Sequence, residues 1–232
     1  MRVGITRTEQ QLGEIIEIAE KRDVKVVPLP LTEIQAIDFE LPRGFNIGED
    51  DWIIFTSANG VESFFKGMSR KPVRIPHSCR IAVVGKKTLH AVEEQGYDVS
   101  FVPSEPYGKT LFDVFIEQFG SDARKVMYAR AETVQFDPEQ QFGNAGIDYY
   151  PVVCYRSVFQ TIDVTLVAGL TATDAILFTA PSAVNAYSMQ FGQPIARPIA
   201  IGRTTAAEME KLDWARVVVM AEPDIAKILE IV

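Results

Sequence analysis

Residues 50–64 read DDWIIFTSANGVESF, and this stretch is the clearest indication of the fold. Its first part, WIIFT at 52–56, is apolar and rich in residues that favour strands. Val61, Phe64 and Met68 then recur at helical spacing, which predicts a helix with one apolar face. A buried strand that leads directly into an amphipathic helix is the building block of parallel sheets, so the stretch indicates an α/β protein.

The same alternation of strand-like and helix-like stretches continues along the chain. Ten apolar runs predict strands, and most of them precede a stretch with helical spacing. The runs lie at 2–6, 24–29, 52–56, 80–85, 99–103, 125–129, 147–155, 175–179, 198–202 and 216–220. Because a parallel neighbour needs a long crossover connection, strands separated by helices predict parallel sheets.

The two halves of the chain resemble each other. At an offset of 123 residues, an identical residue follows Val3, Arg7, Pro28, Ile53, Phe55, Thr56 and Val61. At an offset of 117 residues, the same holds for Gly85, Thr88, Glu93, Glu105 and Pro106. The order is preserved, so the sequence predicts a duplication of one five-stranded unit and two flavodoxin-like domains. On this pattern alone, two contiguous halves are favoured, and an interdomain cleft is the expected ligand site.

Composition limits the classes of function. The chain has 232 residues, 47% of them hydrophobic, and a formal net charge of −8. This acidic balance argues against a general binder of nucleic acid or of anionic membranes. No run approaches the roughly 20 apolar residues of a membrane-spanning helix, and the N-terminus shows no signal-peptide pattern. We expect a cytoplasmic protein, and a monomer because no coiled-coil repeat is visible.

Cysteine and histidine are scarce. Cys79 and Cys154 are too few for a disulfide framework and lie in apolar segments, so we expect reduced core thiols. His77 and His90 are the only histidines, and no spacing of Cys and His fits a zinc site. The sequence therefore predicts neither a metal site nor a cofactor, and it argues against catalysis by histidine.

Two equivalent loops, FTSANG at 55–60 and FTAPSA at 178–183, join a buried strand to a helix. Ser57, Asn59 and Ser182 can cap these helices or bind a ligand there. A helix start presents free N–H groups and the positive end of the helix dipole, which suits an anion. Plain capping and anion binding both stay open for each loop.

A second pair of loops, VVGKKT at 83–88 and AIGRTT at 200–205, shares a glycine, a cation and a threonine. Thr88 and Thr205 occupy equivalent positions, and we expect them to cap the helices that follow. The adjacent cations favour an anionic ligand, and a solvated surface charge is the alternative. Neither loop matches a dinucleotide fingerprint or a Walker A sequence, so nucleotide binding has little support.

Four further residues lie at or after the ends of strand-like runs. Arg7 and Arg130 end equivalent strands, where a guanidinium can bind a carboxylate or phosphate or form a salt bridge. Ser104 lies in the turn FVPSEPYG at 101–108, on the side expected to face the cleft. Tyr155 ends the run YYPVVCY and can serve as an acid or as a packed hydrogen-bond donor.

These motifs, taken in order, resemble the uroporphyrinogen-III synthase family over essentially the whole chain. The matching elements are VGITR, VVPLPL, DDWIIFTSANGVESF, RIAVVGKKT, VPSEPYG, KVMYARAE, YYPVVCYRS, DAILFTAPSAV and AIGRTTA. The combination of FTSANGV, IGRTTA and the duplication carries most of the resemblance. Ala180 departs from the family's usual serine, and Asp213 and Trp214 replace a common small residue and glycine.

The resemblance implies an exchanged chain path. One domain would combine residues 1–35 with 158–232, and the other would be formed by 38–155. Two extended linkers, at about 34–39 and 156–160, would join them. Each flavodoxin-like domain would still receive five strands.

The resemblance also implies the reaction. The family cyclises the linear tetrapyrrole hydroxymethylbilane, inverts ring D and releases water to form uroporphyrinogen III, with no cofactor. Tyr155 matches the family's candidate acid for hydroxyl departure, and Thr88 and Thr205 match its two cleft threonines. The substrate is rich in carboxylates, and our hypotheses for their contacts are Arg7, Ser57, Asn59, Ser104, Arg130 and Ser182.

Other classes of protein remain as alternatives. One is a two-domain transferase for an anionic small molecule, such as a sugar phosphate or a nucleotide, and another is a hinged binding protein for such a ligand. Both would use the helix starts as anion sites. The missing phosphate loop and the missing acidic metal cluster count against a transferase. A family member that binds a tetrapyrrole without converting it is a further alternative.

Overall fold

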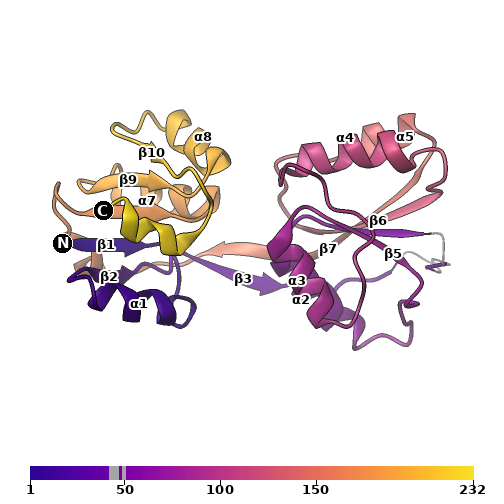
Figure 1. Ribbon diagram of the computed structural model, residues 1–232, viewed down its shortest axis with the longest axis horizontal. Helices are drawn as coiled ribbons and strands as arrows, with labels where there is room; N and C mark the ends of the chain where they lie inside the picture. The colour runs from indigo at the N-terminus through magenta and orange to yellow at the C-terminus, as the bar shows by residue number, and fades with distance from the viewer. Residues whose placement is uncertain (42–46, 49–50) are drawn as a thin grey trace. The chain divides into compact units, whose positions relative to one another are not determined.

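The computed structural model describes residues 1–41, 47–48 and 51–232 (Figure 1). The chain forms two compact units. The first comprises Met1–Glu33 and Ser157–Val232, and the second comprises Ile34–Arg156. The chain therefore passes from one unit to the other twice. The prediction of two contiguous halves is wrong, because a repeat shows which segments are alike and not which segments pair.

The first unit holds a sheet with the strand order β10-β9-β8-β1-β2. Its strands are β1 (Arg2–Ile5), β2 (Lys25–Pro28), β8 (Ala175–Phe178), β9 (Arg197–Ala200) and β10 (Val218–Val219). Every neighbouring pair is parallel. When these strands are numbered along their own unit, the order is that of a flavodoxin-like sheet.

Helices pack on both faces of this sheet. They are η1 (Gln10–Leu12), α1 (Gly13–Glu20), α6 (Thr165–Ala168), α7 (Pro181–Phe191), α8 (Arg203–Lys211) and η2 (Ile225–Glu230). Ala175 and Leu177 of β8 face the cluster that contains α1 and η2. Ile176 and Phe178 face the cluster that contains α7 and α8. A strand buried on both faces reads as a continuous apolar run, which is why the sequence pattern found it.

The second unit holds a sheet with the strand order β3-β7-β6-β4-β5. Its strands are β3 (Thr32–Ala36), β4 (Trp52–Phe55), β5 (Arg80–Val83), β6 (Lys125–Ala131) and β7 (Asp148–Phe159). The pairs among β4, β5, β6 and β7 are parallel. β3 runs antiparallel to β7, since the N–H of Ile37 donates to the Cys154 carbonyl and the N–H of Gln160 donates to the Leu31 carbonyl.

The sequence pattern differs from this sheet at both edges. β3 is polar and mostly exposed, so it lacks the apolar run that reveals a strand. The strand expected at 99–103 is reduced to one bridge between Ala82 and Phe101. The N–H of Phe101 donates to Ile81, and the N–H of Val83 donates to Phe101. The next bond of the ladder would need an N–H at Pro103, which proline lacks.

Helices also divide the core of the second unit. They are α2 (Ala58–Met68), α3 (Lys86–Glu94), α4 (Gly108–Phe119) and α5 (Glu139–Asn144). Ile53 and Phe55 of β4 pack in the cluster that contains α2 and α3. Trp52 and Ile54 pack in the cluster that contains α4 and α5.

The two sheets place equivalent strands alike. β1 has β2 on one side and β8, β9 and β10 on the other. β6 has β7 on one side, and on the other side it has β4, β5 and the bridge to Phe101. The carboxyl ends of parallel strands meet at one edge of a sheet, and in such folds this edge carries the ligand site. The loops after β4, β5, β8 and β9 therefore occupy matching places in their own units.

Candidate functional site

Tyr155 and Ser57 meet at the carboxyl edge of the second sheet. Tyr155 lies near the end of the parallel part of β7, and Ser57 follows β4 by two residues. Their hydroxyl oxygens are 2.8 Å apart, and either hydroxyl can be the donor. Ser57 is also the N-cap of α2, because its Oγ accepts the N–H of Gly60 at 3.0 Å. The structure thus confirms Ser57 as a helix cap, one of the two alternatives left open for this loop, and it adds Tyr155 as a second partner.

Tyr155 reaches Ser57 across the intervening strand β6. The β6–β7 register shifts there, with Arg130 opposite Val153 and Ala131 opposite Tyr155, so Cys154 is an extra residue. Such a bulge re-aims the side chains near it. A Cβ at Gly60 would lie 3.2 Å from Ser57 Oγ and 3.6 Å from Tyr155 Cε1. The absence of a side chain at Gly60 therefore leaves room for the two hydroxyls to meet.

Burial raises the pKa of the Tyr155 phenol, and the hydrogen bond with Ser57 opposes this rise. The net direction is upward, so the phenol carries its proton at neutral pH. A protonated phenol beside a hydroxyl can act as a general acid.

A second tyrosine lies next to this pair. The Tyr128 hydroxyl in β6 is 2.9 Å from Thr56 Oγ1, and Thr56 directly precedes Ser57. Burial raises the pKa of Tyr128 to about 12. Neither Thr56 nor Tyr128 was predicted as a site residue. The one sequence signal for Tyr128 was a polar hydroxyl within the run KVMYA, whose other members are apolar or terminal.

Arg130 forms an ion pair in its own unit. Its Nη1 lies 3.3 Å from Asp137 Oδ2, and Tyr149 donates its hydroxyl to Asp137 Oδ1 at 3.0 Å. Burial is the main cause that raises the pKa of Tyr149, and Asp137 adds to it. The Nε of Arg130 is buried and has no hydrogen-bond partner among the residues that the structure describes. Arg130 therefore combines a carboxylate partner with an unused donor.

Arg7 occupies the matching position in the first unit, after β1. Its Nε is also buried, and in the described part of the chain it has no hydrogen-bond partner. No ion pair involves Arg7 within residues 1–41, 47–48 and 51–232. Burial lowers the pKa of its guanidinium. A half-buried cation without a counter-ion is a strong candidate for an anionic ligand.

Thr88 and Thr205 do not cap their helices, so the capping prediction is wrong. Each is the third residue of its helix, α3 or α8, and the N-caps are Gly85 and Gly202. The two glycines have extended backbones and no side chain that could accept a bond. Thr88 is 3% exposed and Thr205 is 1% exposed. Neither hydroxyl forms a hydrogen bond with another described residue.

The remaining predicted residues lie near helix starts or in a loop. Asn59 is the second residue of α2, and Ser182 is the second residue of α7. Ser104 is exposed in the loop before α4. Within the described ranges, none of these three side chains forms a hydrogen bond. Of all the predicted site residues, only Ser57 and Tyr155 are brought into direct contact with each other.

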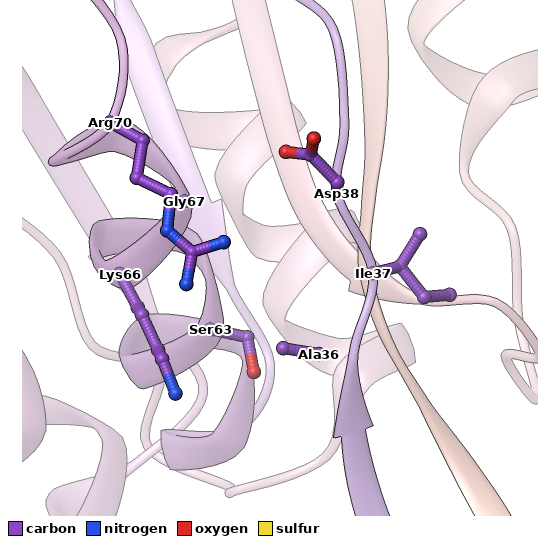
Figure 2. Close-up of a pocket in the computed structure, with 7 residues that line it drawn as sticks. All are labelled: Ala36, Ile37, Asp38, Ser63, Lys66, Gly67 and Arg70. Atoms are coloured by element: carbon purple, nitrogen blue, oxygen red, sulfur yellow. The ribbon is translucent and has the colours of Figure 1, made fainter.

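A small pocket in the second unit lies away from these residues. Ala36, Ile37 and Asp38 line one side (Figure 2). The other side is lined by Ser63, Lys66 and Gly67 of α2 and by Arg70, which lies just after this helix (Figure 2). No predicted site residue lines this pocket. It therefore does not mark the candidate site.

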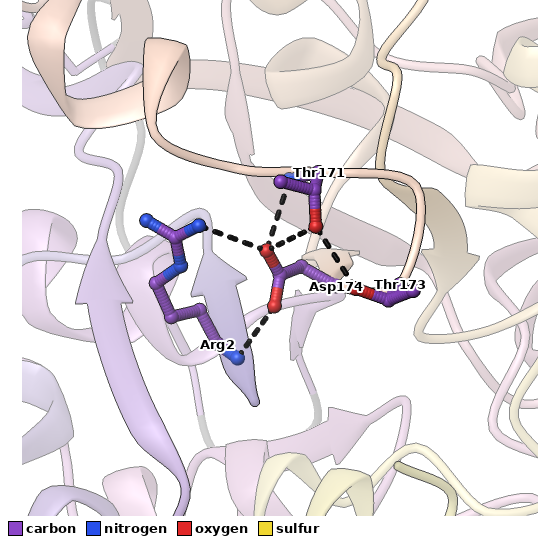
Figure 3. Close-up of polar contacts among 4 residues, drawn as sticks. All are labelled: Arg2, Thr171, Thr173 and Asp174. Atoms are coloured by element: carbon purple, nitrogen blue, oxygen red, sulfur yellow. Dashed lines mark hydrogen bonds and ion pairs between the residues drawn. The ribbon is translucent and has the colours of Figure 1, made fainter.

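The amino edge of the first sheet holds a structural cluster (Figure 3). The Asp174 carboxylate accepts the N–H of Arg2 at 2.7 Å, and it accepts the N–H and hydroxyl of Thr171 at 2.9 and 3.0 Å. Arg2 adds an ion pair at 3.3 Å. Burial raises the pKa of the Asp174 carboxyl, but these partners outweigh it and hold the pKa below its ordinary value.

Neither a metal cluster nor a membrane-spanning helix is present among the described residues. Among the described residues, no group of three or more His, Cys, Asp or Glu side chains could hold a metal ion. In the same residues, no helix is long and apolar enough to cross a membrane.

Known structures share this fold. The uroporphyrinogen-III synthetase of Helicobacter pylori superposes with a TM-score of 0.68 and 19% identity, over 100% of this chain and 98% of that one. A mutant uroporphyrinogen III synthase of Thermus thermophilus gives a TM-score of 0.64 and 16% identity, over 99% and 96%. At these identities, the likeness shows an α/β fold with mostly parallel sheets.

Relatives found by sequence carry the same description. A uroporphyrinogen-III synthase of Synechococcus elongatus is 29% identical over 114 residues, which are 47% of this chain and 42% of that protein. A porphyrin biosynthesis protein HemD of Ruminiclostridium josui is 27% identical over 128 residues, which are 53% of this chain and 25% of that protein. The chain thus matches less than half the length of either relative.

A family model covers far more of the chain. The model described as uroporphyrinogen-III synthase HemD matches residues 13–230. This match does not favour the alternative of a transferase or binding protein for a sugar phosphate or nucleotide. The chain belongs to the uroporphyrinogen-III synthase family.

Proposed function

We propose that this protein cyclises hydroxymethylbilane to uroporphyrinogen III, with inversion of ring D and release of water. Besides family membership, one observation supports this proposal: the Tyr155–Ser57 pair at the carboxyl edge of the second sheet. It supplies a protonated phenol, held by a fixed partner, at the edge where α/β folds bind ligands.

Tyr155 is the proposed acid for hydroxyl departure. Ser57 Oγ already accepts the N–H of Gly60, so its own proton can go to the Tyr155 oxygen. This arrangement leaves the phenol proton free for the leaving hydroxyl of the substrate. The C–O bond breaks, water departs with the Tyr155 proton, and an electrophilic, protonated azafulvene remains. The phenolate regains a proton from the pyrrole carbon that loses one when the ring closes. The substrate's own pyrrole is then the nucleophile, through a spiro intermediate, so no protein nucleophile is required.

Substrate carboxylates are the proposed ligands of the strand-end groups. The proposed contacts are Arg7, Ser57, Asn59, Thr88, Ser104, Arg130, Ser182 and Thr205. Arg7 has the strongest support, because it is half-buried and has no counter-ion in the described chain. The starts of α2, α3, α7 and α8 add free N–H groups at the same edges. Many modest donors can hold a substrate rich in carboxylates without a dense basic patch.

We also propose that the two units arose by internal duplication and that the substrate binds in a cleft between them. The matching strand orders and the offset identities support the duplication. The domain limits 1–35 with 158–232 and 38–155, and the linkers near 34–39 and 156–160, stay predictions. The cytoplasmic location and the monomeric state also stay predictions.

The test is an assay of product isomers. Freshly made hydroxymethylbilane is incubated with the purified protein, the products are oxidised, and the uroporphyrins are separated by chromatography. Uncatalysed closure gives isomer I, so we expect a dominant isomer III peak. Only isomer I, from protein shown to be folded by circular dichroism, would reject the activity. A melting-temperature rise with added uroporphyrinogen III would then identify a protein that binds the tetrapyrrole without converting it.

A further inference from the structure

Two consecutive residues after β4 each bond a tyrosine. Ser57 bonds Tyr155, and Thr56 bonds Tyr128 at 2.9 Å. Tyr155 packs against the core cluster of α2 and α3, whereas Tyr128 belongs to the cluster of α4 and α5. The two phenols therefore hold the start of this loop from opposite faces of the sheet. The proposed mechanism uses only one of them.

Tyr128 packs in the core, and its hydroxyl is already paired with Thr56. Its side chain is 2% exposed and packs edge-on against Phe112, with ring centroids 5.1 Å apart. In the β4–β6 register, Tyr128 lies opposite Ile54, so its ring is on the same face as Thr56, two residues further on. Thr56 Oγ1 is the only partner of the phenol among the described residues. Whatever Tyr128 does at the site, it does through Thr56.

The direction of this bond follows from burial. Tyr128 is almost fully buried and has no other acceptor in the described chain, so its proton would be left unpaired if Thr56 were the donor. Tyr128 therefore donates to Thr56 Oγ1. The half-buried Thr56 hydroxyl then keeps its own proton for a further acceptor. That proton lies next to the N-cap of α2, where the free N–H groups of the helix start also favour an anion.

The equivalent threonine of the first unit has no spare proton. Thr179 donates its hydroxyl to the Thr6 carbonyl at 3.0 Å, and its N–H donates to Thr6 Oγ1 at 2.9 Å. The two hydroxyl oxygens are 3.1 Å apart. Thr6 and Thr179 thus satisfy each other, whereas Thr56 does not have such a closed pair.

We propose that Thr56 is a further ligand of a substrate carboxylate and that Tyr128 is its positioning residue. This inference rests on the proposed function, since the carboxylate belongs to the tetrapyrrole. Tyr128 orients the Thr56 hydroxyl so that its proton points away from the core. The first unit offers no such donor at the equivalent position, so the contact distinguishes the two strand-end loops.

The experiment compares Thr56→Val, Thr56→Ser, Tyr128→Phe and the double variant Thr56→Val/Tyr128→Phe. KM for hydroxymethylbilane, kcat and the Kd of uroporphyrinogen III are measured for each. Loss of a hydrogen bond to a charged group predicts a rise of about tenfold in KM and Kd for Thr56→Val, with kcat nearly unchanged. For Tyr128→Phe we expect a rise of roughly three- to fivefold, since the donor stays but is no longer oriented. Thr56→Ser keeps the hydroxyl, so its KM and Kd should stay near the wild-type values. The double variant should have the same KM and Kd as Thr56→Val alone.

Two matched controls separate positioning from stability. Tyr97→Phe removes a phenol that donates to the Ile75 carbonyl at 3.1 Å in the same unit, near the start of β5. Thr179→Val removes the equivalent threonine hydroxyl of the first unit. Both should leave KM and Kd unchanged, even where the melting temperature falls.

Several results would overturn the inference. If the wild type forms isomer III and Thr56→Val leaves KM and Kd unchanged, Thr56 binds no carboxylate. Effects that multiply in the double variant would show that Tyr128 does not act through Thr56. A fall in kcat alone for Tyr128→Phe would assign it a different role. Absence of isomer III in the wild type would instead reject the proposed function, so the two failures are distinguishable.

Discussion

The loops at 55–60 and 178–183 have the same backbone and different chemistry. Ser57 has φ −161° and ψ 151°, and Ala180 has φ −161° and ψ 154°. Ser57 caps α2 and bonds Tyr155. The methyl side chain of Ala180 cannot accept a hydrogen bond, so α7 has no side-chain cap and begins with Pro181. The packing of strand and helix therefore sets the loop conformation, and the cap is not needed for it. The serine lies in the loop where it also has a tyrosine partner.

The two arginines near the carboxyl ends of β1 and β6, Arg7 and Arg130, differ in a similar way. Both have a buried Nε without a partner in the described chain. Arg130 is paired with Asp137, while Arg7 has no ion pair there. Equivalent positions thus provide one neutralised cation and one available cation. The second unit thus holds the bonded Ser57 and Tyr155 hydroxyls, and the first unit holds the arginine that has no ion pair in the described chain.

Tyr155→Phe is the sharpest test of the contrast between the loops. Without the phenol proton, the leaving hydroxyl has no acid, so kcat should fall about 100-fold or more. The Kd of uroporphyrinogen III should change little, because the ring still packs. The measurement is steady-state turnover by isomer III formation, with Tyr97→Phe as the control. Unchanged turnover in a folded variant would remove the catalytic role of Tyr155.

Asp174→Asn tests whether the first unit depends on its amino-edge cluster. The carboxylate holds the Arg2 and Thr171 donors, so its loss should lower the free energy of unfolding by about 2 kcal/mol at neutral pH. Because the folded pKa of Asp174 is depressed, this stabilisation is present above the unfolded pKa and disappears as pH falls through the folded pKa. Denaturant melts of both proteins from pH 7 to pH 2 measure it. A difference that stays constant down to pH 2 would contradict the assignment.

Arg7→Gln and Arg130→Gln separate the free cation from the paired one. Loss of a charge-assisted hydrogen bond predicts about tenfold weaker product binding for Arg7→Gln. The effect of Arg130→Gln should be smaller, because Asp137 already competes for that guanidinium. Isothermal titration with uroporphyrinogen III measures both Kd values. If Arg130→Gln weakens product binding as much as Arg7→Gln or more, the ion pair with Asp137 does not reduce the contribution of Arg130 to binding.

Ala180→Ser makes the first loop like the second and has the smallest expected effect. Since the backbone is already that of Ser57, the new hydroxyl can accept an N–H at the start of α7. An N-cap serine in place of alanine stabilises by about 1 kcal/mol. The unfolding midpoint in urea should rise, with turnover unchanged. A lower midpoint would mean that the site has no room for the hydroxyl.

Part of the candidate site could be predicted from the sequence and part could not. The sequence pointed to Tyr155, Ser57 and Arg7, because each ends or follows an apolar run at the carboxyl end of a strand. Their roles stay predictions. Tyr128 was missed, because its strand position looks like core. The capping prediction for Thr88 and Thr205 failed, because two extended glycines start those helices. A local pattern does not say which residue of a loop is the cap.

Apolar periodicity and motif order are local properties of the chain, so the sequence alone predicted the alternation of strands and helices, the parallel sheets and the family. The tertiary structure was needed to show which strands share a sheet and which hydroxyls meet. Thr56 and Tyr128 are 72 residues apart, and Ser57 and Tyr155 are 98 residues apart. Contacts at such separations depend on strand order and register, and a single bulge or a glycine without a Cβ decides whether they form.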